Sequence, residues 1–177
     1  MQPRASQPQA MQSRVRQRVM VVGSPGAGKS TFARQLAQSS GLPLTHLDDL
    51  YWRPGWVRPP PEVWQVQMGE AVSAERWILD GNYAGTLHLR AQRADTAIVL
   101  AYPRGLCLRR AIVRAVFKRR PDAKELGKEP LDWAFLRFIW TFPKLGKQQL
   151  EQLRAVPHLE VVVLRNDEQA RTFLARC

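Results

Sequence analysis

The sequence predicts an α/β protein, a three-layer α/β/α sandwich built on a mainly parallel sheet of five strands. Short apolar segments alternate with longer amphipathic segments along the 177 residues, which is typical of repeated strand–helix units. A glycine-rich loop joins the first such strand to the first helix. The chain is long enough for one domain with its own core, which we expect over residues 17–177.

The first unit begins with an apolar, β-branched stretch at residues 17–22, which favours a strand. Residues 29–40 follow the glycine-rich loop and predict a helix that ends at Gly41 and Pro43. Residues 44–47 then form a short second strand, which leads directly into two aspartates.

The middle of the chain continues the alternation. Pro61 is well suited to the first turn of a helix, predicted over residues 61–75. The third strand occupies residues 77–79. A helix over residues 84–92 connects it to a fourth strand at residues 96–101.

The last third is mostly helical. A basic helix is predicted over residues 104–119, and the helical pattern resumes over residues 131–154, interrupted at Pro143. Residues 159–164 form the fifth strand, and a helix over residues 167–176 closes the chain.

The glycine-rich loop satisfies the spacing Gly-x-x-x-x-Gly-Lys-Ser, and it lies between a strand and a helix as that motif requires. Glycines allow successive backbone N–H groups to face inward and bind phosphate at a helix N-terminus. A turn that merely resembles the motif is the alternative, but chance rarely matches all of its fixed positions. We therefore predict a nucleoside-triphosphate site formed by Gly23, Ser24, Pro25, Gly26, Ala27, Gly28, Lys29, Ser30 and Thr31. Lys29 is expected to reach the β- and γ-phosphates, and the Ser30 hydroxyl to bind Mg²⁺.

Carboxylates follow the second and third strands, and the carboxyl ends of parallel strands meet at one edge of the sheet. Asp80 is expected to help place Mg²⁺ there, although it could instead cap or turn the chain. Asp48 or Asp49 is expected to hold a substrate hydroxyl or accept its proton. Their side chains diverge, and Asp48 is the better candidate if the strand directs its last side chain into the site. A turn acid that caps the next segment is the alternative.

The net charge of +12 is unevenly distributed. Residues 104–128 hold nine basic and two acidic side chains. Such a local cluster suits a polyphosphate better than a long duplex. The basic residues expected to neutralise a phosphoryl group during transfer are Arg110, Arg114, Arg119 and Arg120. A solvated cationic helix face is the alternative. The opposite, apolar face of this helix comprises Leu108, Ile112, Ala115 and Val116.

Aromatic and histidine residues give weaker signals. Three tryptophans around the loop after the second strand could stack on a base or sugar, or could anchor that loop: Trp52, Trp56 and Trp64. Three apolar residues at helical spacing are predicted to pack in the core: Trp133, Leu136 and Trp140. The histidines have no metal-ligand spacing and are assigned no role: His46, His88 and His158.

The remaining composition excludes several classes of protein. Cys107 and Cys177 lie far apart, which favours neither a disulfide framework nor a metal site and predicts a cytoplasmic location. No run of 18 apolar residues would cross a membrane. Residues 1–16 lack the apolar core of a signal peptide and are expected to form a disordered extension.

Together these motifs resemble the P-loop nucleoside-monophosphate-kinase-like superfamily, most closely the adenylate-kinase-related "DNA topology modulation protein" (FlaR-like) group. The resemblance covers about residues 17–142. It is carried by Gly23–Thr31, Leu47–Trp52 with Pro54-Gly55-Trp56, Trp77–Tyr83, Arg90, Ala94–Thr96, Pro103-Arg104, and Cys107 with the arginines around it.

The resemblance implies ATP and Mg²⁺ as cofactors and an arginine-bearing helical lid at about residues 114–130. It also implies a substrate region after the second strand, with Arg53 and Trp56, and an adenine pocket near Arg165. Adenylate kinases follow the Asp-Gly of the third strand with Phe-Pro-Arg. This chain has Asn82-Tyr83 there, and Arg90 could substitute for the missing arginine.

The sequence therefore predicts an ATP-dependent phosphotransferase for a small acceptor, a nucleotide or nucleoside, acting as a monomer or dimer. Two alternatives remain open at this point. One is a nucleotide-responsive protein that binds nucleic acid, although no specific motif supports DNA as a partner. The other is a plain nucleoside triphosphatase.

Overall fold

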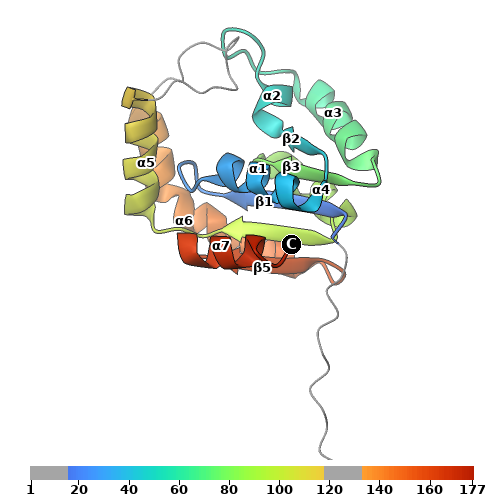
Figure 1. Ribbon diagram of the computed structural model, residues 1–177. Helices are drawn as coiled ribbons and strands as arrows, with labels where there is room; N and C mark the ends of the chain where they lie inside the picture. The colour runs from blue at the N-terminus through green and yellow to red at the C-terminus, as the bar shows by residue number, and fades with distance from the viewer. Residues whose placement is uncertain (1–15, 118–132) are drawn as a thin grey trace, which may run out of the picture.

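The computed structural model describes residues 16–117 and 133–177. Its sheet has five parallel strands in the order β2-β3-β1-β4-β5. The strands are β1 (Arg18–Gly23), β2 (Leu44–His46), β3 (Trp77–Asp80), β4 (Thr96–Leu100) and β5 (Glu160–Leu164). The predicted parallel sheet is confirmed (Figure 1).

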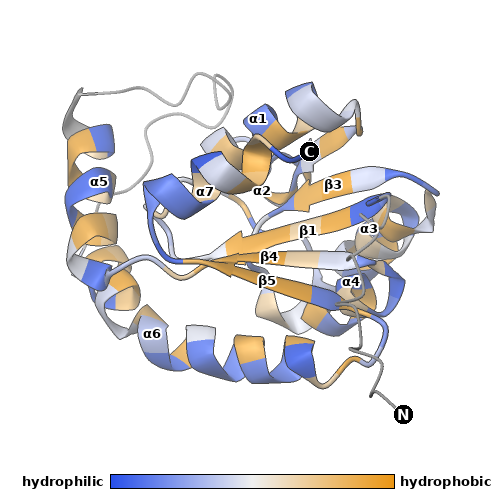
Figure 2. Cartoon of the chain, turned by 60° about the horizontal axis from the view of Figure 1, so that its bottom comes forward, coloured by the Kyte–Doolittle hydropathy of each residue, from blue (hydrophilic) through white to orange (hydrophobic). Residues whose placement is uncertain are grey.

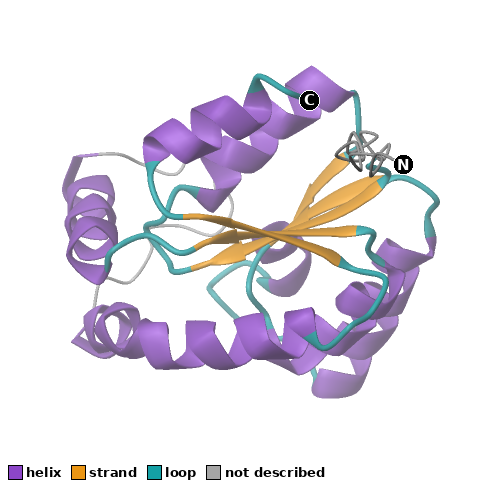
Figure 3. Ribbon diagram, turned by 90° about the horizontal axis from the view of Figure 1, so that it is seen from below, coloured by secondary structure: helices purple, strands orange, loops and turns teal. Residues whose placement is uncertain are grey.

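Helices cover both faces of the sheet, which Figure 3 shows edge-on. One face is covered by α1 (Lys29–Ser40) and α7 (Asp167–Leu174). The other is covered by α3 (Pro61–Ser73), α4 (Leu87–Arg93) and the C-terminal part of α6 (Trp133–Arg154). The remaining helical segments are α2 (Leu47–Tyr51), η1 (Ala84–Thr86) and α5 (Arg104–Phe117). In Figure 1, α5 stands beyond the carboxyl ends of the strands.

The central strand shows why the core has two halves. Val19 and Val21 pack on the side of α1, whereas Met20 and Val22 pack on the side of α3 and α4. Successive side chains of a strand point to opposite faces, so a strand buried on both faces must be apolar throughout. Figure 2 shows the strands as the most hydrophobic part of the chain.

Local signals set the helix boundaries. Gly41 ends α1 with a left-handed φ of 67°, and its N–H donates to the carbonyl of Ala37 over 2.9 Å. Pro61 occupies the first turn of α3 as predicted. The Oδ1 atom of Asn166 caps α7 by accepting from the N–H of Gln169 over 2.8 Å.

Two predicted elements differ in the structure. β2 ends at His46 rather than at Leu47, and the two aspartates lie in the short helix α2, which was not predicted. α6 continues through Pro143 without the predicted interruption, because a helix can lose one backbone hydrogen bond where packing holds both halves.

The prediction of core positions for three residues of α6 is wrong. Trp133 is 86% exposed and Trp140 is 49% exposed, with Leu136 only half-buried. Ile139 and Phe142 are the buried residues instead. Trp140 instead makes a cation–π contact, with the guanidinium of Arg104 lying 4.0 Å from the centre of its ring.

Two other predictions concern segments that lie mostly outside the described residues. They are the disordered extension at residues 1–16 and the lid at about residues 114–130. No helix within the described ranges is both long and apolar enough to cross a bilayer.

Candidate functional site

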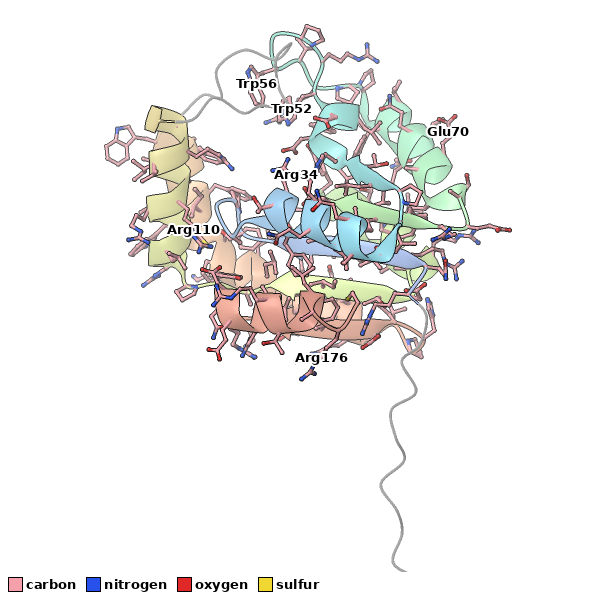
Figure 4. The ribbon with its side chains drawn as sticks, in the orientation of Figure 1. Arg34, Trp52, Trp56, Glu70, Arg110 and Arg176 are labelled. Atoms are coloured by element: carbon pink, nitrogen blue, oxygen red, sulfur yellow. The ribbon has the colours of Figure 1, made fainter. Side chains whose placement is uncertain are left out.

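A large cavity of about 1730 Å³ opens at the carboxyl ends of the strands. The glycine-rich loop and α1 form one side, and α5, α6 and α7 form the other. α2 and the segment after it complete the wall. Figure 4 shows Arg34 of α1 and Arg110 of α5 on opposite sides of this opening, with Trp52 and Trp56 above Arg34.

The glycine-rich loop lies on the cavity and requires its glycines. Residues Pro25 to Thr31 line the cavity, whereas Gly23 and Ser24 lie behind it. Gly26 has a left-handed φ of 80°, and a Cβ atom on it would lie 2.1 Å from the carbonyl oxygen of Cys107. The loop therefore packs directly on the first turns of α5, which brings the basic helix beside the phosphate cradle.

Lys29 directs its ammonium group into this loop. Its Nζ atom donates to the carbonyl of Ser24 over 3.2 Å. Ser30 and Thr31 follow on the cavity wall. Backbone N–H groups at a helix N-terminus together with a lysine suit a triphosphate.

Asp80 lies at the end of β3 on the cavity wall, and only 4% of it is exposed. Its Oδ2 atom accepts from Nδ1 of His46 over 2.8 Å. Its Oδ1 atom is buried and has no hydrogen-bond partner among the described residues. A buried carboxylate oxygen facing a phosphate site suits a water of a Mg²⁺ shell.

His46 was assigned no role from the sequence, yet it holds Asp80. The hydrogen bond with Asp80 raises the pKa of His46 above 6.5, although burial opposes the shift. A folded-state pKa above the unfolded value stabilises the fold fully below pH 6.5. That stabilisation is lost as pH rises through the raised pKa.

We therefore expect the unfolding free energy of His46→Asn to be lower than that of the original chain, and this difference to become smaller as pH increases. Urea unfolding followed by ellipticity between about pH 5.5 and pH 9 measures the difference in unfolding free energy at each pH. Replacing the exposed His158 in the same way is the control. A difference for His46→Asn that is constant across this pH range would contradict the pairing.

Asn82 joins the loop after β3 to the glycine-rich loop. Its Nδ2 atom donates to the carbonyl of Gly23 over 2.6 Å, and its Oδ1 atom accepts from the N–H of Gly23 over 3.0 Å. A two-point contact fixes orientation as well as distance. Asn82 therefore positions the start of the phosphate loop.

Of the two aspartates in α2, Asp48 faces the cavity. Asp48 lines it, whereas Asp49 is exposed and does not. The hydroxyl of Tyr83 donates to Oδ1 of Asp48 over 2.7 Å. The preference for Asp48 agrees with this geometry.

The structure gives Arg90 a different position from the one expected. It is 0% exposed and does not line the cavity. Its Nη1 atom donates to the carbonyl of Gly81 over 2.7 Å, and its Nη2 atom donates to those of Asn82 and Tyr83 over 2.5 and 3.1 Å. Burial lowers its pKa to about 10, so it remains charged near neutral pH. The expected contact with an acceptor is wrong, because backbone carbonyls engage the guanidinium.

Arginines of α5 do reach the cavity, although the predicted faces of this helix were misplaced. Arg110 and Arg114 line the cavity, together with Arg109, which was not singled out. Cys107 and Ala111 are buried, and Leu108 of the predicted apolar face is half-buried against the core, whereas Ile112 and Ala115 of that face are exposed. The other two predicted arginines, Arg119 and Arg120, lie outside the described residues.

Arg110 closes the cavity toward α7. Its Nη2 atom lies 2.6 Å from Oδ2 of Asp167, and its guanidinium lies 5.3 Å from the ring centre of Tyr102. Burial opposes ionisation of Asp167, but hydrogen bonds from Arg110 and Tyr102 outweigh it and lower the pKa of Asp167. Burial raises the pKa of Tyr102 to about 12.

The resemblance placed three further residues in the site, and the structure does not bring all of them to the cavity. Trp56 lines the cavity, whereas Arg53 and Arg165 are exposed and do not. Arg58, which the sequence reading passed over, lines it instead of Arg53.

Some of the missed residues had a signal and others had none. Arg34 lies one turn beyond Ser30 in α1, so helical spacing alone places both on one face. His46 pairs with Asp80 because the register of β2 on β3 sets them side by side, which the sequence does not specify.

Comparison with solved structures identifies the fold. Shikimate kinase from Acinetobacter baumannii, in complex with shikimate, aligns with a TM-score of 0.59 and 16% identity, over 90% of this chain and 89% of that one. The YorR protein from Bacillus subtilis, in complex with phosphorylated GDP, aligns with a TM-score of 0.57 and 12% identity, over 89% and 94%. The fold is therefore that of the P-loop kinases. No family model and no curated protein matches the sequence.

Proposed function

We propose that this protein is an ATP-dependent kinase that phosphorylates a hydroxyl group of a small acceptor, a nucleoside or nucleotide. The observation that supports it most is the position of Asp48 on the same cavity as the glycine-rich loop. A triphosphatase needs the phosphate loop, whereas transfer also needs a base and a binding wall for the acceptor.

Donor binding would use the loop and the end of β3. Backbone N–H groups from Gly26 to Ser30, with Lys29, would hold the β- and γ-phosphates. Ser30 and the buried Oδ1 atom of Asp80 fit a site for Mg²⁺. Mg²⁺, when bound, would neutralise part of the phosphate charge.

Asp48 would accept the proton of the acceptor hydroxyl. The hydroxyl oxygen forms a bond to the γ-phosphorus, the bond from that phosphorus to the bridging oxygen breaks, and ADP leaves. Tyr83 orients Asp48 by its hydrogen bond. Arg110 and Arg114 would neutralise the phosphoryl group during transfer, with Arg119 and Arg120 remaining predictions.

We expect Asp48→Asn to lower acceptor-dependent turnover about 10²- to 10⁴-fold, because the amide cannot take the proton. ATP affinity should remain within about threefold, since Asp48 lies on the acceptor side. Asp49→Asn is the matched comparison and should retain most turnover, because Asp49 is exposed outside the cavity lining. Greater loss for Asp49→Asn than for Asp48→Asn would reverse this assignment.

A screen of ADP release across nucleoside monophosphates, nucleosides and small hydroxylated metabolites tests the function. A kinase releases ADP faster with its acceptor, and the product carries the phosphate. ADP release at one rate with and without every acceptor would indicate a triphosphatase instead. Tight duplex DNA binding with a steep salt dependence, and no acceptor effect, would favour a nucleic-acid-binding role.

A further inference from the structure

We propose that the acceptor is an alcohol with a planar unsaturated ring, as in a nucleoside or nucleotide, and that Trp52 and Trp56 hold this ring. The inference rests on the proposed kinase function and assigns the part of the cavity that binds the acceptor ring. It excludes non-aromatic polyols as the preferred acceptors.

The acceptor side of the cavity is an aromatic wall, defined here as Tyr51, Trp52, Trp56 and Tyr83. All four line the cavity, and all four are only partly buried. These rings share the cavity wall with Asp48, which is proposed to meet the acceptor hydroxyl, so they adjoin the place where the acceptor would lie. Partly buried aromatic surface is a ready stacking platform for another planar ring.

The rings of the wall form a corner rather than a flat sheet. The centres of Trp52 and Trp56 are 5.4 Å apart with their planes at 65°. A planar ring resting on one indole would therefore meet the other nearly edge to face, an arrangement that aromatic pairs favour. The ring of Tyr51 packs edge to face against Trp52, with the ring centres 5.0 Å apart and the planes at 89°.

A strained turn places Trp56 in this corner. Trp56 has a left-handed φ of 61°, directly after Gly55 at 79°. An antiparallel bridge between Arg53 and Val57 closes the turn, with the N–H of Arg53 donating to the carbonyl of Val57 over 3.1 Å. A bulky residue in this region costs about 1–3 kcal/mol, and such strain is found mostly at ligand sites. The turn thus returns the Trp56 ring to the cavity.

Charged groups of both signs lie near the corner. Asp48 lies on the same wall, held by the Tyr83 hydroxyl. Its carboxylate can accept a hydrogen bond from the acceptor hydroxyl while the ring rests on the indoles. Arg34 and Arg58 also line the cavity. Arg58 lies over Trp52, 5.7 Å from its ring centre, where it extends the stack.

The test measures ADP release and product phosphorylation by the full chain with three groups of probes. The first contains ribo- and deoxyribonucleosides and pyridoxine, the second contains nucleoside 5′-monophosphates, and the third contains shikimate and gluconate. At least one probe of the first or second group should be phosphorylated with the highest kcat/KM. Highest kcat/KM for a probe of the third group overturns the inference while the kinase function stands. ADP release that no probe accelerates overturns both.

Variants then test the corner directly. Trp56→Leu should raise the acceptor KM about 5- to 150-fold, the range expected for loss of one stacking contact. ATP affinity should stay unchanged, which also reports that the variant is folded. Trp56→Phe should recover part of the affinity, because a planar ring returns. Trp133→Leu is the control, since Trp133 is 86% exposed and outside the cavity lining. An unchanged acceptor KM in Trp56→Leu would overturn the assignment.

Discussion

Replacing Lys29 with alanine is expected to lower kcat about 10³-fold or more while leaving the fold intact. Its ammonium group lies inside the phosphate loop, hydrogen-bonded to the carbonyl of Ser24. In the reaction this ammonium group would stabilise the negative charge that accumulates on the β- and γ-phosphates. Loss of one preorganised donor to a developing charge typically costs about 10²- to 10³-fold, and a cation on a transferring phosphoryl group contributes more.

Steady-state kinetics measures the expected loss of kcat, and thermal unfolding checks that the fold is intact. Lys147→Ala is the matched control, because Lys147 is an exposed lysine of α6 outside the cavity lining. Turnover in Lys29→Ala within about tenfold of the original chain would remove Lys29 from the transfer step.

Replacing Arg90 with methionine is expected to cost about 3–5 kcal/mol of unfolding free energy, the largest stability effect predicted for this chain. Methionine fills similar space but donates no hydrogen bond. The carbonyls of Gly81, Asn82 and Tyr83 would each lose the partner that Arg90 supplies. Tyr83 has a left-handed φ of 28°, so this turn is held in a conformation that it would otherwise leave.

Urea unfolding measures the unfolding free energies of Arg90→Met and Arg93→Met, two variants in the same helix. Arg93 is exposed and donates only long hydrogen bonds, at 3.3 and 3.4 Å, to the carbonyls of Val72 and Ser73. We expect Arg93→Met to cost under about 1 kcal/mol. Equal losses in the two variants would mean that the buried guanidinium does not hold the turn.

The turn after β3 links two walls of the cavity. Asn82 fixes Gly23 of the glycine-rich loop, and Tyr83 donates to Asp48 of α2. Arg90 secures the backbone of both residues. Two neighbouring residues thus connect the glycine-rich loop to α2.

Much of the fold follows from local sequence. The alternation of apolar and amphipathic segments predicted all five strands. The signal is strongest for the inner strands β3, β1 and β4, which are buried on both faces and largely apolar, whereas the edge strands β2 and β5 are mostly half-buried. The phosphate loop is a contiguous motif whose geometry its own glycines set. Asp48 and Asp80 were both expected at the sheet edge, and both line the cavity there.

The failures arise where tertiary contacts, rather than local pattern, decide which way a side chain points. Arg90 was expected to substitute for the arginine missing from the adenylate-kinase pattern, but three carbonyls of one turn accept its hydrogen bonds. On α5, Cys107 packs beside Gly26 of the glycine-rich loop and Leu108 packs on the core, but the other apolar residues selected by helical spacing, Ile112 and Ala115, are exposed. Trp133 and Trp140 follow a helical period, yet their face of α6 does not meet the core.

Following the γ-phosphate of radiolabelled ATP tests the central claim most directly. The full chain, Mg²⁺ and the best acceptor from the screen are incubated with the labelled nucleotide, and the products are separated. The proposed function predicts label on a hydroxyl of the acceptor, lost in Lys29→Ala and strongly reduced in Asp48→Asn. Label recovered only as inorganic phosphate, at one rate with and without acceptor, would contradict it.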